Sequence, residues 1–323
     1  MYLALMCAMF GLLWFRGFDQ LGRVNWLIVG PVLPLFMLFC IADAVIAHNH
    51  NHVPIFKNKW ANLATGCLIS FFYGFPSFGW IPTHNLNHHS YNNRPGDLSI
   101  TTRPLRRPSI WAELMYPTVV SLTQTRVLMP FLKRRWKMGD RFMVYRAVVE
   151  YAFFYGVMIT LFVIDWQKAL LFAVLPQQIS LFTIQSFNYL QHVETNADTD
   201  YNHSRNFTGK LLNAFLFNNG YHTVHHEKPG LHWSLAPEAH AKVAHLIDDR
   251  LQQKNAFTYW LGRFILDPLR GKKPEFQTLP ADLTLDTIRV TSRGAATEHL
   301  PPEKPTEDGS LAPAFMKGAG QDR

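Results

Sequence analysis

The segment His222-Thr223-Val224-His225-His226 places three histidines within five positions. Residues three and four apart lie on the same face of a helix, so the three imidazoles would point to nearly one side. Neutral imidazole is the commonest metal ligand among protein side chains. The spacing therefore indicates a metal-binding segment rather than three separate structural histidines.

Further histidines recur at the same short spacings. Nine of the 15 histidines form this set: His48, His52, His84, His88, His89, His192, His222, His225 and His226. His50, between His48 and His52, points to another helix face and is excluded from the set of candidate ligands. Asn188 precedes His192 by four residues, so its amide shares the face of His192 and can reach a metal ion or its water.

Nine imidazoles exceed what one tetrahedral zinc ion can use. They suit two metal ions that keep open positions, and a site rich in imidazole suits iron, copper or zinc. The apolar surroundings favour iron with O2, because an acyl chain offers chemistry only at unactivated C–H bonds. Hydrolysis by zinc would need a polarisable ester or amide and usually a carboxylate base.

Apolar segments separate the histidine groups. Hydrophobic residues make up 48% of the chain although its mean hydropathy is −0.03, so apolar and polar blocks alternate. Residues 27–47, 146–164 and 169–190 are long enough to span a bilayer, and 165–168 form a polar turn. Residues 1–15 are apolar but reach only about 22 Å as a helix. If they are counted as a crossing, four spans result.

Residues 60–81 are apolar but broken by glycines and prolines, and a histidine group lies at each side. We expect a shallow or re-entrant hairpin, which leaves both groups at one side of the membrane. Between Pro82 and Arg146 there are eleven Lys or Arg residues and three acids. This bias predicts a cytoplasmic segment. No nucleic-acid motif accompanies it, so we expect no nucleic-acid partner.

The remaining sequence is largely polar. We expect membrane helices and the first histidine groups in 1–190, a cytosolic cap in 191–291 and a disordered tail in 292–323. A helix is predicted at 237–253, and the amphipathic segment 211–217 is suited to the membrane surface.

Taken together, the motifs HxxxH at 48–52, HxxxHH at 84–89 and HxxHH at 222–226 resemble those of the membrane fatty acid desaturase family. The resemblance runs from about Leu27 to Ala241. It implies an all-α integral membrane protein with four transmembrane helices and a cytosolic helical cap that holds a non-haem di-iron site. It also implies that all nine histidines are iron ligands, that Asn188 acts through a water, and that His192 is the additional ligand before the last motif.

Two departures from the family pattern concern the reaction. The first motif usually has Asp after its first histidine, where this chain has Asn49. The stretch from Asn188-Tyr189 to His192 is similar to a motif of alkane hydroxylases. We predict an O2-dependent fatty acyl desaturase, with a hydroxylase of alkyl or acyl chains as the alternative. A membrane metal transporter fits less well, because transport sites lie near the bilayer midplane and each motif here lies just outside a span.

The resemblance implies an acyl lipid, acyl-CoA or acyl-carrier-protein substrate and O2 as co-substrate. No haem-binding stretch, CxxC spacing or GxGxxG motif is visible, so electrons are expected from a separate ferredoxin or cytochrome-type donor. We expect the protein in a bacterial cytoplasmic membrane, in contact with its lipids, with the active site on the cytoplasmic side.

An apolar substrate tunnel is the last expectation. Its wall is predicted to include Phe71, Phe72, Tyr73, Phe75, Phe182, Phe187 and Tyr189. Among the acids, Asp43 lies five residues before His48 and either orients a ligand imidazole or is a plain helix-end residue. Glu194, Asp200 and His203 are further candidates for the surroundings of the metal.

Overall fold

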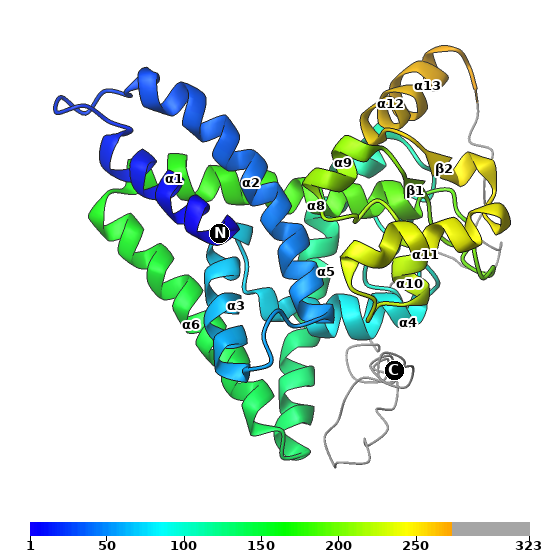
Figure 1. Cartoon of the computed structure of the whole chain (residues 1–323), viewed down its shortest axis with the longest axis horizontal. Coiled ribbons are helices and arrows are strands. Elements are labelled where there is room, and N and C mark those ends of the chain that lie inside the picture. Colours follow the sequence, from blue (N-terminus) through cyan, green and yellow to red (C-terminus); the bar gives the residue numbers. More distant parts are fainter. Residues whose placement is uncertain (273–323) are drawn as a thin grey trace. The chain divides into compact units, whose positions relative to one another are not determined.

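The computed structural model describes residues 1–272, and this part of the chain is mostly helical. Packing divides it into two units, each built from two stretches of sequence (Figure 1). Of the described residues, the first unit comprises 1–80 and 134–184, and the second comprises 81–133 and 185–272. The tail predicted at 292–323 lies outside the described residues, and the predicted boundary at residue 190 stays a prediction.

The first unit contains the apolar helices. They are α1 (Tyr2–Arg16), α2 (Trp26–His52), α3 (Lys59–Tyr73), α6 (Arg141–Ile164), α7 (Trp166–Lys168), the π-helix η3 (Ala169–Val174) and the start of α8 (Leu175–His192). Their shared core includes Leu13, Phe36, Cys40 and Phe172. Within a bilayer, close van der Waals packing of such side chains holds the helices together, because lipid is as apolar as the side chains and provides no hydrophobic driving force between helices.

Within residues 1–272, three helical segments are long and apolar enough to cross a membrane: 26–52, 141–164 and 166–192. They match the three longer spans expected from the sequence. Helix α1 has only 15 residues, so the fourth crossing stays a prediction. On α6 many of the exposed side chains are apolar, with Val148, Ile159 and Val163 each more than half exposed, as expected of a helix surface in contact with lipid.

The broken segment 60–81 forms the short helix α3 followed by irregular structure. The side chain of Asn58 caps α3 by accepting hydrogen bonds from the amides of Trp60 and Ala61. The helix ends at Gly74, which has φ of 95° and lies so close to Gln177 that a Cβ atom would meet it at 2.6 Å. The predicted break is therefore found at Gly74, whereas α3 continues through Gly66. A 3-10 turn, η1 (Ser77–Gly79), then leads to the π-helix η2 (Ile81–His88) and the short α4 (His89–Tyr91).

The second unit is built from η2, α4, most of α5 (Ile110–Lys137) and the end of α8 together with short elements. The short elements are β1 (Asn206–Phe207), α9 (Lys210–Phe215), α10 (His222–Glu227), η4 (Trp233–Leu235), α11 (Ala236–Val243), η5 (Ala244–Leu246), η6 (Asp249–Leu251), β2 (Gln252–Gln253), α12 (Ala256–Leu261), η7 (Gly262–Leu266) and α13 (Asp267–Leu269). Strands β1 and β2 pair in parallel, Asn206 with Gln252 and Phe207 with Gln253.

The helix predicted at 237–253 is wrong beyond Val243. The chain turns extended at Ile247, and the side chain of Asp248 then caps the new 3-10 turn η6 by accepting from the amide of Arg250. Aspartate competes with the helical backbone in this way and favours caps and turns. The following residues are drawn into the pairing with β1, which a helical pattern in the sequence does not reveal.

Candidate metal centre

Four of the predicted ligands come together within the second unit. His88 ends η2, His192 ends α8, and His222 and His226 lie on α10. Their ligand nitrogens all lie within 4.8 Å of one another. The Nε2 atom of His192 is 3.1 Å from that of His88 and 2.8 Å from that of His222, which in turn is 3.1 Å from that of His226. Four imidazoles from three elements thus converge on one point.

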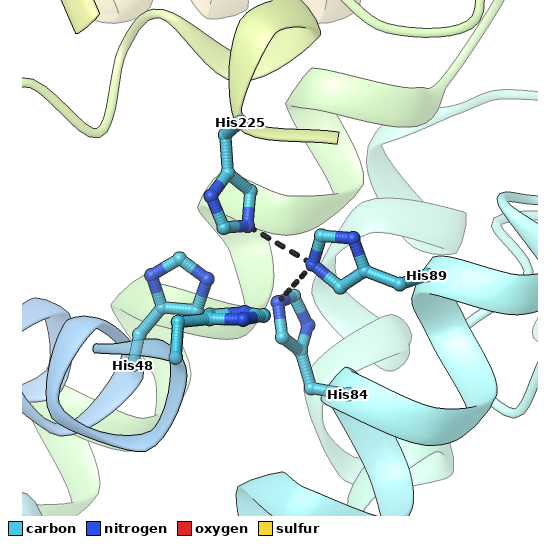
Figure 2. A group of neighbouring side chains, drawn as sticks. His48, His84, His89 and His225 are labelled. Carbon is cyan, nitrogen blue, oxygen red and sulfur yellow. Dashed lines mark hydrogen bonds between the residues drawn. The ribbon is translucent and has the colours of Figure 1, made fainter. Parts of the chain in front are cut away.

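A second convergence in the same unit joins His84, His89 and His225 (Figure 2). The Nε2 atom of His89 is 3.1 Å from that of His84 and 3.0 Å from that of His225. The π-helical form of η2 contributes to this contact, because a π-helix bonds residue i to i+5 and so brings position 89 over position 84. An α-helical reading of the sequence places His89 to one side.

His88 has a carboxylate behind it. Its Nδ1 lies 2.8 Å from Oδ2 of Asp97, and both side chains are fully buried. Because a carboxylate accepts hydrogen bonds, Nδ1 carries the proton, and Nε2 of neutral His88 presents a lone pair. This lone pair faces the Nε2 atom of His192. A carboxylate bound to the far nitrogen of a ligand imidazole is the usual support of metal-binding histidines.

The fit of the four histidines to a metal ion follows from these contacts. Neighbouring nitrogens in a tetrahedral site with bonds of about 2.1 Å are roughly 3.4 Å apart. The observed Nε2–Nε2 separations are slightly shorter and also suit N–H···N hydrogen bonds between imidazoles, so the geometry is compatible with a bound metal ion but does not require one. The pKa of His226 is held well below its usual value, first by desolvation of the ring and then by the nearby imidazoles of His89 and His222. The neutral form, which metal binding requires, is thereby favoured.

His48 and His52 belong to the first unit. They lie at the end of α2 with ring centroids 4.8 Å apart, and the ring of Trp80 is 5.2 Å from that of His48. His50 points to another side, as predicted. Its Nε2 lies 3.3 Å from the carbonyl oxygen of Asn62, and its Nδ1 accepts from the amide of Ile55. The role of His48 and His52 as ligands stays a prediction.

Asn188 is oriented by a tyrosine. Its side-chain nitrogen donates to the hydroxyl of Tyr116 at 2.7 Å, and that hydroxyl donates to the carbonyl oxygen of Ser99 at 2.6 Å. Burial raises the pKa of Tyr116, so the hydroxyl keeps its proton. These bonds fix which end of the Asn188 amide is the oxygen, and they leave that oxygen as the acceptor for a water.

The acids differ from the sequence-based expectations. Both carboxylate oxygens of Asp43 are buried without a hydrogen-bond partner in the described part of the chain, so the prediction that Asp43 orients an imidazole is wrong. Glu194 binds Arg263, with 2.7 Å between Oε2 and Nε, and Asp200 is exposed. His203 is buried with its ring 5.4 Å from that of His226, and its Nε2 is 3.3 Å from Glu227.

Asp97 was not identified from the sequence. It follows His88 by nine residues, and the turn that returns it to His88 contains Asn92, Asn93 and Gly96 with positive φ. Asp97 is tied down there by the amides of Asn93 and Ser99, each 2.7 Å from a carboxylate oxygen. The Asn-Asn-Arg-Pro-Gly-Asp stretch signals a turn, but no spacing rule connects its last residue to His88.

The aromatic residues predicted for the tunnel lie in several environments. Phe71 and Phe72 pack in the core of the first unit, against Phe10 and Phe36 respectively. Tyr189 is buried with its ring 5.1 Å from that of Tyr116. The others comprise Tyr73 near Trp80, Phe75 near Tyr151, Phe187 near Phe207, and Phe182, which is 40% exposed. Their role in a tunnel stays a prediction.

Comparison with known proteins agrees with the histidine pattern. The model of the fatty acid desaturase family matches residues 24–258, which is most of the chain and contains all nine histidines. The chain therefore belongs to the fatty acid desaturase family, a class of membrane oxidoreductases of lipid metabolism whose histidines bind metal. Searches of curated proteins and of solved structures returned no match.

Proposed function

We propose that this protein is an O2-dependent fatty acyl desaturase that holds two irons. The observation that carries the proposal is the pair of separate histidine convergences, around His192 and around His89, in a chain of this family with three membrane-capable helices. His88, His192, His222 and His226 hold one metal ion. His84, His89 and His225 hold the other, His48 and His52 are further iron ligands, and Asn188 acts through a water. Bound iron supplies the activation of O2 needed to break unactivated C–H bonds.

The net reaction balances with an external reductant. One –CH2–CH2– unit, O2, two electrons and two protons give one –CH=CH– unit and two waters. The electrons come from a separate ferredoxin or cytochrome-type donor, and the acyl group is delivered as a lipid, a CoA ester or a carrier-protein ester. The chain's own part is to hold the ligands neutral, to fix His88 through Asp97, and to hold two neighbouring methylenes in an apolar tunnel at the cytoplasmic side of the membrane.

The alternative is hydroxylation of the chain at the same centre. It is favoured by the sequence from Asn188-Tyr189 to His192 and by the way Tyr116 fixes the amide of Asn188 beside this motif. The two reactions use the same ligands and differ in whether a second hydrogen lies within reach after the first is removed.

The deciding experiment is product analysis. The chain is expressed in a host with a matched redox donor, and total fatty acids are analysed by mass spectrometry beside a His88→Ala control. We expect an internal alkene that is absent from the control, with alcohol as a minor product. Mostly alcohol would establish the hydroxylase, whereas activity without O2, carried by stoichiometric zinc, would refute an oxygenase of either kind.

A further inference from the structure

Helix α6 carries an ion pair inside a segment that is otherwise apolar enough to span a membrane. Nε of Arg146 lies 2.8 Å from Oε1 of Glu150, one helical turn further on. The side chain of Glu150 is fully buried and that of Arg146 is 15% exposed. Ionised side chains at such positions are costly, and they are retained where they pair and serve a function.

The second carboxylate oxygen of Glu150 binds a different part of the chain. Oε2 accepts from the hydroxyl of Ser77 at 2.9 Å and from the amide of Phe78 at 2.7 Å. Both residues lie in the turn η1, and Phe78 precedes His84 in the chain by only six residues. The carboxylate thus fixes the backbone from which the second histidine motif starts.

The guanidinium of Arg146 reaches the first histidine motif. Its Nη2 donates to Oδ1 of Asn51 at 2.7 Å, and the amide nitrogen of Asn51 donates to the carbonyl oxygens of Ala47 and Ser77 at 2.8 and 3.0 Å. Asn51 lies between His48 and His52 on the last turn of α2. The chain of bonds from Glu150 through Arg146 to Asn51 therefore sets the direction of that turn.

A glycine leaves the space for this network. A Cβ atom on Gly66, in α3, would lie 2.7 Å from Oε1 of Glu150, closer than carbon and oxygen approach in proteins. The position is mid-helix, where glycine is unfavourable relative to alanine. The close approach of the Glu150 carboxylate explains why a glycine occupies this position.

We propose that Arg146 and Glu150 are a positioning pair for the histidine site, which orients His48 and His52 through Asn51. This role rests on the proposed function, in which both histidines bind iron. The pair is not needed merely to pack α6, since well-packed apolar residues of the same volume stabilise a buried position as well or better. What a planar, forked guanidinium adds is a fixed direction for the groups that it binds.

The test uses the full chain in lipid nanodiscs with Glu150→Gln, Gly66→Ala and the double variant Glu150→Gln/Arg146→Met. Gly156→Ala is the control for the glycine, because nothing lies within 4 Å of a Cβ there. Glu238→Gln is the control for the carboxylate, because Glu238 pairs with Lys242 one turn away on an exposed surface. Hydrogen–deuterium exchange of residues 47–53 and 77–80, iron content and melting temperature are measured.

Glu150→Gln and Gly66→Ala are expected to accelerate exchange in both segments by about tenfold and to lose about half of the iron, with the controls unchanged. The double variant leaves no unpaired buried charge, so it should recover the melting temperature but not the iron. If the double variant recovers full iron content and slow exchange, the pair serves stability alone and the proposal is overturned. A wild-type chain without iron refutes the proposed function and the metal-positioning role. If exchange in that iron-free chain is still slow in the wild type and faster in Glu150→Gln, the pair only stabilises the end of α2.

Discussion

Replacement of Asp97 by Asn tests the support of His88 most directly. In the wild type, Oδ2 of Asp97 accepts from His88 Nδ1 and from the amide of Asn93, while Oδ1 accepts from the amide of Ser99. The asparagine amide keeps one oxygen and replaces the other by a donor. In either orientation, at least one buried N–H group therefore faces another donor.

The expected size of the effect follows from these bonds. A lost hydrogen bond to a charged group costs about 1.5–3 kcal/mol when its partner remains buried. Loss of the partner behind a ligand histidine lowers metal affinity or activity by about 10- to 100-fold, which corresponds to about 1.4–2.8 kcal/mol. A stability of about 5–15 kcal/mol is typical of a domain, so Asp97→Asn should still fold.

The assay combines iron dissociation, monitored by a chromogenic chelator, with product formation and thermal unfolding. Asp198→Asn serves as the control because Asp198 is 83% exposed and pairs with Arg94 at the surface, where ion pairs contribute about 0–1 kcal/mol. We expect faster iron loss and lower activity in Asp97→Asn alone. A variant that unfolds earlier but releases iron at the wild-type rate would refute the reasoning, since Asp97 would then only stabilise its own turn.

Three further outcomes follow from the site and the helices. His88→Ala and His225→Ala, which remove one ligand from each convergence, should each lose iron and activity together; a variant that keeps two irons would contradict its assignment as a ligand. In a background without native cysteines, Ser90→Cys and Asp198→Cys should react from the cytoplasmic side and Gln167→Cys from the opposite side, since all three positions are exposed. Labelling of the first two from different faces would refute a common cytoplasmic surface. Removal of the metal by chelation should lower the melting temperature reversibly. The free energy of unfolding should fall by about 4 kcal/mol if metal had been present at a thousandfold its Kd. An unchanged melting temperature would mean that the converging imidazoles do not hold a metal.

The convergence of the histidines could be predicted from the sequence because their spacing is local. His222, His225 and His226 lie on one helix, α10, and a period of three to four residues is sufficient to place them together. The apolar helices could be predicted for a similar reason, because length and hydrophobicity decide whether a segment can cross a bilayer. These predictions needed no knowledge of tertiary structure.

The residues that support the histidines could not be predicted from the sequence, because they act across turns and between helices. Asp97 reaches His88 only because a sequence of positive φ angles reverses the chain, and Glu150 reaches Phe78 from another helix. The π-helical form of η2 was missed because its residues fit an α-helical pattern equally well. Asp43, which sequence proximity to His48 favoured, has no such contact.

The difference between the histidine motifs and the residues that support them also matters for which product the reaction gives. Desaturation and hydroxylation begin with removal of the same kind of hydrogen and use the same histidines, so the ligand set cannot decide between alkene and alcohol. The outcome depends on where the acyl chain lies, and a displacement of about 1 Å can change a rate by about a hundredfold. Positions are set by the residues that hold the ligands and the chain: Asp97 behind His88, Tyr116 behind Asn188, and Glu150 with Arg146 behind Asn51. If the proposed function holds, we therefore expect product selectivity to depend on this supporting network and on the predicted tunnel wall, not on the histidine motifs by which the family is recognised.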